Sequence, residues 1–250
     1  MSDTHKSITL VNYEGDSLAV SAEEAMIKKY NSWEGWQCSA GAENIFIDAD
    51  GYVYVAACKV KGKQGNVFKD EWDLTEEWTT CPAKWCMCGQ DMQLRKVRDD
   101  SFFSLMDYPP STNVTEMDRV DWVVPTYYHG FVTHPRFVTW DLGRRCNFSC
   151  SYCHPLISNQ TDPLRTEEEL MRAVKLIENK FTKKNKAKWI FTGGEPTIIP
   201  SYMKMIKMLR EKGHDLHTQT NGSRNADYHR ELLRYSFVGI SVHFEFANDD

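Results

Sequence analysis

Short strand-like segments alternate with amphipathic helical segments from about residue 137 onward. The strand candidates, several of them rich in β-branched and aromatic residues, are residues 137–141, 188–192, 215–220 and 237–242. Between them, a capping box at Thr166 and Glu169 predicts the start of one helix, and two further helices are expected near 201–212 and 226–235. Alternation of this kind predicts an α/β fold in which parallel strands are joined by right-handed crossovers.

Three cysteines follow the first of these strands at a spacing that suits a metal cluster. Cys146, Cys150 and Cys153 form the pattern Cys-x3-Cys-x2-Cys. A [4Fe–4S] cluster normally takes four cysteine ligands, so three would leave one iron with an open coordination position. An open position makes a metal site reactive, whereas a structural zinc site usually has four closed ligands. The spacing therefore favours a reactive iron–sulfur cluster over zinc.

Two more motifs and a serine follow the later strands in order. Gly193-Gly194-Glu195-Pro196 comes after the second strand, Thr220-Asn221-Gly222 after the third, and Ser241 lies near the end of the fourth. Together with the three cysteines, this set resembles the radical S-adenosylmethionine (SAM) enzymes. Each motif alone is a weaker signal, but the combination is specific. We therefore expect the (β/α) barrel core of that superfamily.

The resemblance implies a role for each motif. The three cysteines would bind the [4Fe–4S] cluster, and Tyr152 would lie beside the cluster and the adenine of SAM. The turn at residues 193–196 would meet the amino group of SAM, with Glu195 taking part. Thr220 and Asn221 would lie along the SAM binding path, and Ser241 near the ribose. His243 departs from the commonest family pattern, so it is expected either to line the pocket or to contact the substrate.

The other five cysteines lie within the first 100 residues. They are Cys38, Cys58, Cys81, Cys86 and Cys88. Residues 44–55 predict a β-hairpin, with Asp50-Gly51 as a type I′ turn. The hairpin and the cysteines together resemble a SPASM or twitch domain. This resemblance implies an auxiliary [4Fe–4S] cluster, with Cys38 and Cys58 as the ligands that the family pattern favours most. The resemblance leaves open which of the other three cysteines is spare, and zinc or free buried thiols are the alternatives.

These patterns predict three parts of the chain. Residues 1–100 would form the cysteine-rich auxiliary domain, residues 101–136 a linker, and residues 137–250 the radical SAM core. The family core has six β/α units, whereas about four are recognisable here. We therefore expect a partial, truncated barrel, either because the chain is a fragment or because other strands come from elsewhere.

Charge and hydropathy limit the partners. The net charge of −5 gives the chain no global electrostatic reason to bind nucleic acid, so a nucleic-acid partner is not expected. No stretch of about 18 apolar residues predicts a membrane span, and the first residues lack the apolar segment of a signal peptide. A cytoplasmic location is therefore expected, and in a reducing compartment cysteines favour metal binding over disulfides.

The resulting functional hypothesis is a radical SAM enzyme. It would cleave SAM reductively, with an electron from a donor such as flavodoxin or ferredoxin, and the 5′-deoxyadenosyl radical would abstract hydrogen from the substrate. The SPASM-like segment favours a peptide or protein substrate. The alternatives are a small-molecule or RNA-base substrate, and a non-catalytic iron–sulfur or electron-transfer protein.

Overall fold

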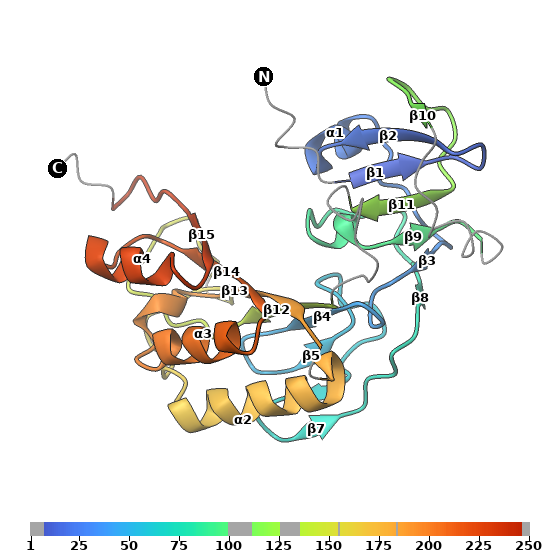
Figure 1. Ribbon diagram of the computed structural model, residues 1–250. Coiled ribbons are helices and arrows are strands. Elements are labelled where there is room, and N and C mark those ends of the chain that lie inside the picture. Colours follow the sequence, from blue (N-terminus) through green and yellow to red (C-terminus); the bar gives the residue numbers. More distant parts are fainter. Residues whose placement is uncertain (1–7, 100–111, 126–135, 155, 184, 247–250) are drawn as a thin grey trace. The chain divides into compact units, whose positions relative to one another are not determined.

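The computed structural model describes most of the chain, and Figure 1 shows its helices and strands. The described residues are 8–99, 112–125, 136–154, 156–183 and 185–246. The chain separates into two compact units. The first comprises residues 1–44, 55–60 and 75–134, and the second comprises residues 45–54, 61–74 and 135–250.

The first unit is built on a seven-stranded sheet with the strand order β10-β2-β1-β11-β9-β3-β8. Its strands are β1 (Ile8–Val11), β2 (Asp16–Val20), β3 (Gln37–Cys38), β8 (Thr79–Thr80), β9 (Lys96–Val97), β10 (Thr112–Asn113) and β11 (Trp122–Pro125). Helix α1 (Ala22–Ile27) follows β2 and begins with a capping box between Ser21 and Glu24. A short 3-10 helix, η1 (Asp91–Gln93), precedes β9.

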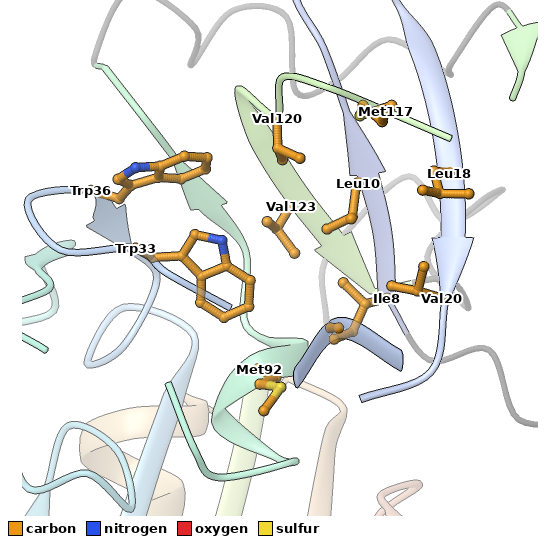
Figure 2. Packing of buried hydrophobic residues seen from close by; sticks show 11 residues of the cluster. Ile8, Leu10, Leu18, Val20, Trp33, Trp36, Met92, Met117, Val120 and Val123 are labelled. Atoms are coloured by element: carbon orange, nitrogen blue, oxygen red, sulfur yellow. The ribbon is translucent and has the colours of Figure 1, made fainter. Parts of the chain in front are cut away.

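Apolar side chains of this sheet form a compact core. Ile8 and Leu10 alternate along β1 and are fully buried, together with Val123 of β11. Figure 2 shows these side chains converging from neighbouring strands, with the indole rings of Trp33 and Trp36 at one side of the cluster. Burial of large aromatic side chains supplies much of the apolar area that stabilises a small unit of this kind.

The second unit contains the alternating strands and helices that the sequence predicts. Its parallel strands are β12 (Arg136–Asp141), β13 (Ala187–Thr192), β14 (Asp215–Thr220) and β15 (Phe237–Ile240). The helices between them are α2 (Glu167–Ile177), which continues as the π-helix η4 (Glu178–Thr182), then α3 (Tyr202–Glu211) and α4 (Ala226–Leu232); the 3-10 helix η5 (Pro196–Ile198) precedes α3. The α/β fold class is confirmed, whereas the truncated barrel stays a prediction.

Helices cover the apolar face of this sheet. Trp189 and Phe191 of β13 are buried, while the alternate residues Lys188, Ile190 and Thr192 are half-buried. The ring of Tyr202 from α3 meets Phe191 edge-on, with the ring centroids 5.9 Å apart. Apolar residues recur at every second position of the strand and at helical spacing in α3. The apolar face of the helix therefore packs against the apolar face of the sheet. None of the helices in the described part of the chain is long and apolar enough to cross a membrane.

The predicted hairpin forms, but it joins the parallel sheet. Strands β4 (Asn44–Ile47) and β5 (Val53–Tyr54) extend the sheet beyond β12, giving the order β15-β14-β13-β12-β4-β5. The amide of Gly51 donates to the carbonyl of Asp48 at 2.8 Å, and Gly51 has φ +83° whereas Asp50 does not have a positive φ. The prediction of a type I′ turn is therefore wrong, because that turn needs two successive residues with positive φ.

The compact units divide the chain differently from the predicted domains. Residues 45–54 and 61–74, the latter containing the small β6 (Gly65–Asn66) and β7 (Glu71–Trp72) pair, belong with the parallel sheet although they fall within the predicted domain of residues 1–100. Within the predicted linker, 112–125 supply β10 and β11, while 101–111 and 126–135 lie outside the described residues. The domain bounds themselves stay a prediction.

Candidate functional site

The predicted SAM-site residues all lie near the carboxyl ends of the parallel strands. The cysteine loop follows β12, the turn at residues 193–196 follows β13, Thr220 ends β14, and Ser241 follows β15. Parallel strands bring these ends to one edge of the sheet, which is the edge where α/β proteins place their chemistry.

Two glycines allow the turn after β13 to approach the start of the cysteine loop. Gly193 has φ +126°, and a Cβ atom there would lie 2.5 Å from Oδ1 of Asp141. A Cβ atom on Gly194 would lie 2.3 Å from the carbonyl oxygen of Arg145. The amide of Gly194 donates to the carbonyl of Gly143 at 2.7 Å. No other residue type fits this approach without displacing the backbone that leads into the cysteines.

The carboxylate of Glu195 connects the second motif to the third. Glu195 is buried, and its Oε1 accepts hydrogen bonds from the amide of Thr197 at 3.0 Å, the hydroxyl of Thr197 at 2.5 Å and the hydroxyl of Thr220 at 2.8 Å. Its Oε2 accepts from the amide of Asn221 at 2.7 Å. Both oxygens are therefore engaged by this chain, and Glu195 holds the Thr220-Asn221 turn in place. Its predicted contact with SAM stays a prediction.

The three cysteines of the loop are free thiols held by local hydrogen bonds. The amide of Phe148 donates to Sγ of Cys146 at 3.4 Å, and Nδ2 of Asn221 lies 3.7 Å from the same sulfur. Burial, together with the nearby Cys150 and Cys146 thiols, raises the pKa of Cys153. The sulfurs thus share one environment, and Asn221 joins the third motif to the first.

The loop carries donors of the kind that an iron–sulfur cluster takes. Among the described residues, which include all eight cysteines, no group of three or more His, Cys, Asp or Glu side chains is arranged to hold one metal ion. A single zinc ion needs its thiolates about 2.3 Å from one centre. Each thiolate of a cubane cluster instead binds a different iron. Three thiols and N–H donors aimed at Cys146 therefore fit a [4Fe–4S] group.

Tyr152 and Ser241 have partners that sequence reasoning missed. The Tyr152 ring is 60% exposed and stacks on His243, with centroids 5.9 Å apart and planes at 13°. Ser241 donates its amide to the carbonyl of Thr220 at 2.9 Å, and its hydroxyl accepts from Nε2 of Gln219 at 2.7 Å. The alternation along β14 could have identified Gln219, because it places that side chain on the face opposite Thr220.

A cavity lies at the carboxyl ends of β12 and β13. Its lining residues are Leu142, Gly143, Arg145, Pro163, Leu164, Arg165, Thr192, Glu195, Pro196 and Ile199. It contains two members of the predicted SAM turn and two arginines that sequence reasoning did not select. Behind the turn, burial raises the pKa of Asp141 to about 6.

Four of the five cysteines of the first unit influence one another. Cys38 pairs with Thr79 across β3 and β8, so Cys81, two residues further along, falls on the same face. Burial raises the pKa of Cys58 to about 11 and that of Cys86 to about 12, and the Cys38 and Cys81 thiols contribute to both shifts. Cys88 is half-buried.

Comparisons with known proteins agree with the geometry of the second unit. Residues 140–250 match the family model of the radical SAM superfamily. A probable GTP 3′,8-cyclase of Thermococcus kodakarensis is 30% identical over 109 residues, which cover 41% of this chain and 33% of the relative. A probable GTP 3′,8-cyclase of Pyrococcus abyssi is 38% identical over 103 residues, which cover 40% of this chain and 32% of the relative. The Fe-coproporphyrin III synthase of Methanosarcina barkeri is 28% identical over 109 residues, which cover 42% of this chain and 26% of the relative.

The similarity spans about a third of the length of these cyclases. It also corrects one expectation, because the cyclases are named for a reaction of GTP, which is a small molecule. The predicted peptide or protein substrate is therefore wrong. That expectation depended on the SPASM-like segment, which the family match at residues 140–250 does not include.

Proposed function

Because residues 140–250 of this chain form a radical SAM domain, we propose that the protein cleaves SAM reductively and uses the resulting radical on a small molecule. Cys146, Cys150 and Cys153 would hold a [4Fe–4S] cluster. When bound, the cluster supplies one low-potential electron to the sulfonium of SAM, which yields methionine and a 5′-deoxyadenosyl radical. That radical would abstract a hydrogen atom from the substrate.

The observation that carries this proposal is the meeting of three motifs at one sheet edge. The amide of Glu195 donates to the carbonyl of Arg145 at 2.9 Å, directly before Cys146. The Glu195 carboxylate in turn holds the amide of Asn221, whose side chain reaches Cys146. A SAM molecule at an open iron would therefore find the residues 193–196 and the Asn221 turn already in position, which lowers the cost of ordering the site.

The chain's own groups would orient SAM. The close approach at Gly193 and Gly194 seats the turn directly against the backbone before Cys146. At the end of β15, Gln219 orients the hydroxyl of Ser241, which then presents a fixed polar group towards the expected ribose position. Groups that are already in position lower the cost of ordering the reactants.

A small anionic substrate, with a nucleotide as the first candidate, suits the second unit. The relatives named for GTP support this class. Arg145 and Arg165 line the cavity at the ends of β12 and β13, and Nε of Arg165 is buried with no hydrogen-bond partner among the described residues. Arginines provide planar, charge-assisted donors for phosphate or carboxylate groups.

The test is an anaerobic SAM-cleavage assay on the reconstituted chain. With dithionite and SAM, we expect 5′-deoxyadenosine by mass spectrometry, more of it when GTP is added, and none from Cys150→Ala. If the cluster loads but no 5′-deoxyadenosine forms, the protein is a non-catalytic iron–sulfur protein. If 5′-deoxyadenosine forms without any response to GTP or other nucleotides, the nucleotide class fails while SAM cleavage stands.

A second metal centre in the first unit is supported by the cysteine placement. Cys38, Cys58, Cys81 and Cys86 would hold an auxiliary [4Fe–4S] cluster, with Cys88 as the spare cysteine. The carboxylate of Asp91 accepts the amide of Cys58 at 2.8 Å and so fixes that cysteine. We expect Cys38→Ala to lower the iron content and Cys88→Ala to leave it unchanged. Equal iron in both variants, or bound zinc instead of iron, would contradict this assignment.

A further inference from the structure

The segment after β15 lies across the cysteine loop. We call residues 243–246 the clasp. Within it, Oε2 of Glu245 accepts the amide of Ser151 at 2.8 Å, and Oε1 accepts the Ser151 hydroxyl. The ring of Phe246 stacks on Phe148, with centroids 4.5 Å apart and planes at 10°. The clasp thus contacts the loop on both sides of Cys150.

His243 is the clasp residue that faces a predicted iron ligand. Its Nδ1 lies 3.1 Å from Sγ of Cys150 and 2.5 Å from the hydroxyl of Tyr152. The imidazole stacks on the Tyr152 ring, while Phe148 meets it edge-on at 5.7 Å and 72°. Two aromatic neighbours therefore hold the ring, and they direct its Nδ1 towards the sulfur.

We propose that His243 is a positioning residue for the cluster site and donates an Nδ1–H hydrogen bond to the sulfur of Cys150. This inference rests on the proposed function. A thiolate bound to iron carries no proton, so it can only accept a hydrogen bond, and the ring must supply the hydrogen from Nδ1. The hydroxyl oxygen of Tyr152 then lies beside the same N–H and accepts from it as well.

The expected consequence concerns the ease of reducing the cluster. Hydrogen bonds to cluster sulfurs are among the factors that set its reduction potential, because they stabilise the added negative charge. A donor at Cys150 therefore makes reduction easier than it would be without His243. The clasp also orders the loop, since its contacts reach four loop residues, 148 and 150–152, through ring stacking and hydrogen bonds.

The experiment compares two substitutions at His243 in the full chain. His243→Phe keeps a ring between its aromatic neighbours but removes the donor. His243→Asn removes the ring but places an amide N–H near the position of Nδ1. His229→Phe is the matched control, because His229 lies on α4 and its ring contacts Tyr228, far from the loop in sequence. The readouts are iron content and the midpoint potential of the electron paramagnetic resonance signal that responds to SAM.

We expect His243→Phe to shift the midpoint potential to a more negative value, His243→Asn to restore most of the shift, and His229→Phe to have no effect. If His243→Phe fails to retain iron, retention by His243→Asn supports the proposal equally. An unchanged potential in an iron-loaded His243→Phe protein overturns it, as does an Asn variant as defective as the Phe variant. If the unsubstituted protein shows no SAM-responsive signal, the proposed function itself fails.

Discussion

The substitution Glu195→Gln tests whether one buried carboxylate holds the site together. A glutamine side chain keeps one acceptor oxygen but replaces the other with an NH₂ group. That group must face the backbone amide of either Thr197 or Asn221, and both are donors fixed by the chain. The threonine hydroxyls can rotate to other partners, whereas a backbone amide cannot.

The expected loss of stability follows from the number of hydrogen bonds that the substitution removes. One hydrogen bond to a charged acceptor is lost at a site that is 2% exposed, and such a bond contributes about 1.5–3 kcal/mol. Because the NH₂ group of the glutamine then faces a backbone N–H, and neither group can accept a hydrogen bond, we use the upper part of this energy range. We expect the free energy of unfolding to fall by about 2–3 kcal/mol, which is roughly a 30- to 150-fold change in the unfolding equilibrium.

Urea unfolding followed by circular dichroism measures this change without SAM. Glu211→Gln is the control, because Glu211 is an exposed residue at the end of α3 and its substitution should change stability by less than about 0.5 kcal/mol. A Glu195→Gln protein as stable as this control would refute the reasoning. It would mean that the carboxylate does not hold the two turns.

Two further predictions follow from the same unit. Gly194→Ala places a Cβ atom 2.3 Å from the carbonyl oxygen of Arg145, so it should displace the turn and weaken SAM binding at least tenfold by calorimetry; unchanged affinity would contradict the close approach. His214 accepts the amide of Ala187 at Nδ1, and burial lowers its pKa, so the unfolded chain takes up the proton first. Stability should therefore fall as the pH drops below about 6.5. His214→Asn, which cannot titrate, should show a smaller slope in urea unfolding between pH 5 and 6.5, and an equal slope would contradict the assignment.

The elements of the second unit were predictable because each has a local cause. The helix α2 begins at the capping box of Thr166 and Glu169, as the sequence predicts. The four parallel strands carry alternating or continuous apolar residues, so their number and order also followed. The meeting of the motifs at one sheet edge followed as well, because parallel strands share a carboxyl edge.

The partners of the site were not predictable in the same way. The hairpin of β4 and β5 was expected within an N-terminal domain, and only the assembled sheet places it beside β12. Glu195 was assigned to SAM, but its carboxylate meets Thr220 and Asn221, about 25 residues later in the chain. His243 was considered for the pocket or the substrate, and its contact with Cys150 spans 93 positions.

The sequence alone therefore predicted the resemblance to the radical SAM superfamily, the cysteine loop that carries it and the α/β order of the second unit. These depend on residue type and on spacing over a few positions, where backbone geometry is local. The tertiary structure decided which side chains meet: the Glu195 network, the hairpin at the edge of the parallel sheet, and the clasp over the cysteine loop. Such contacts join distant residues, and their geometry depends on how whole elements pack, which no short pattern in the chain encodes.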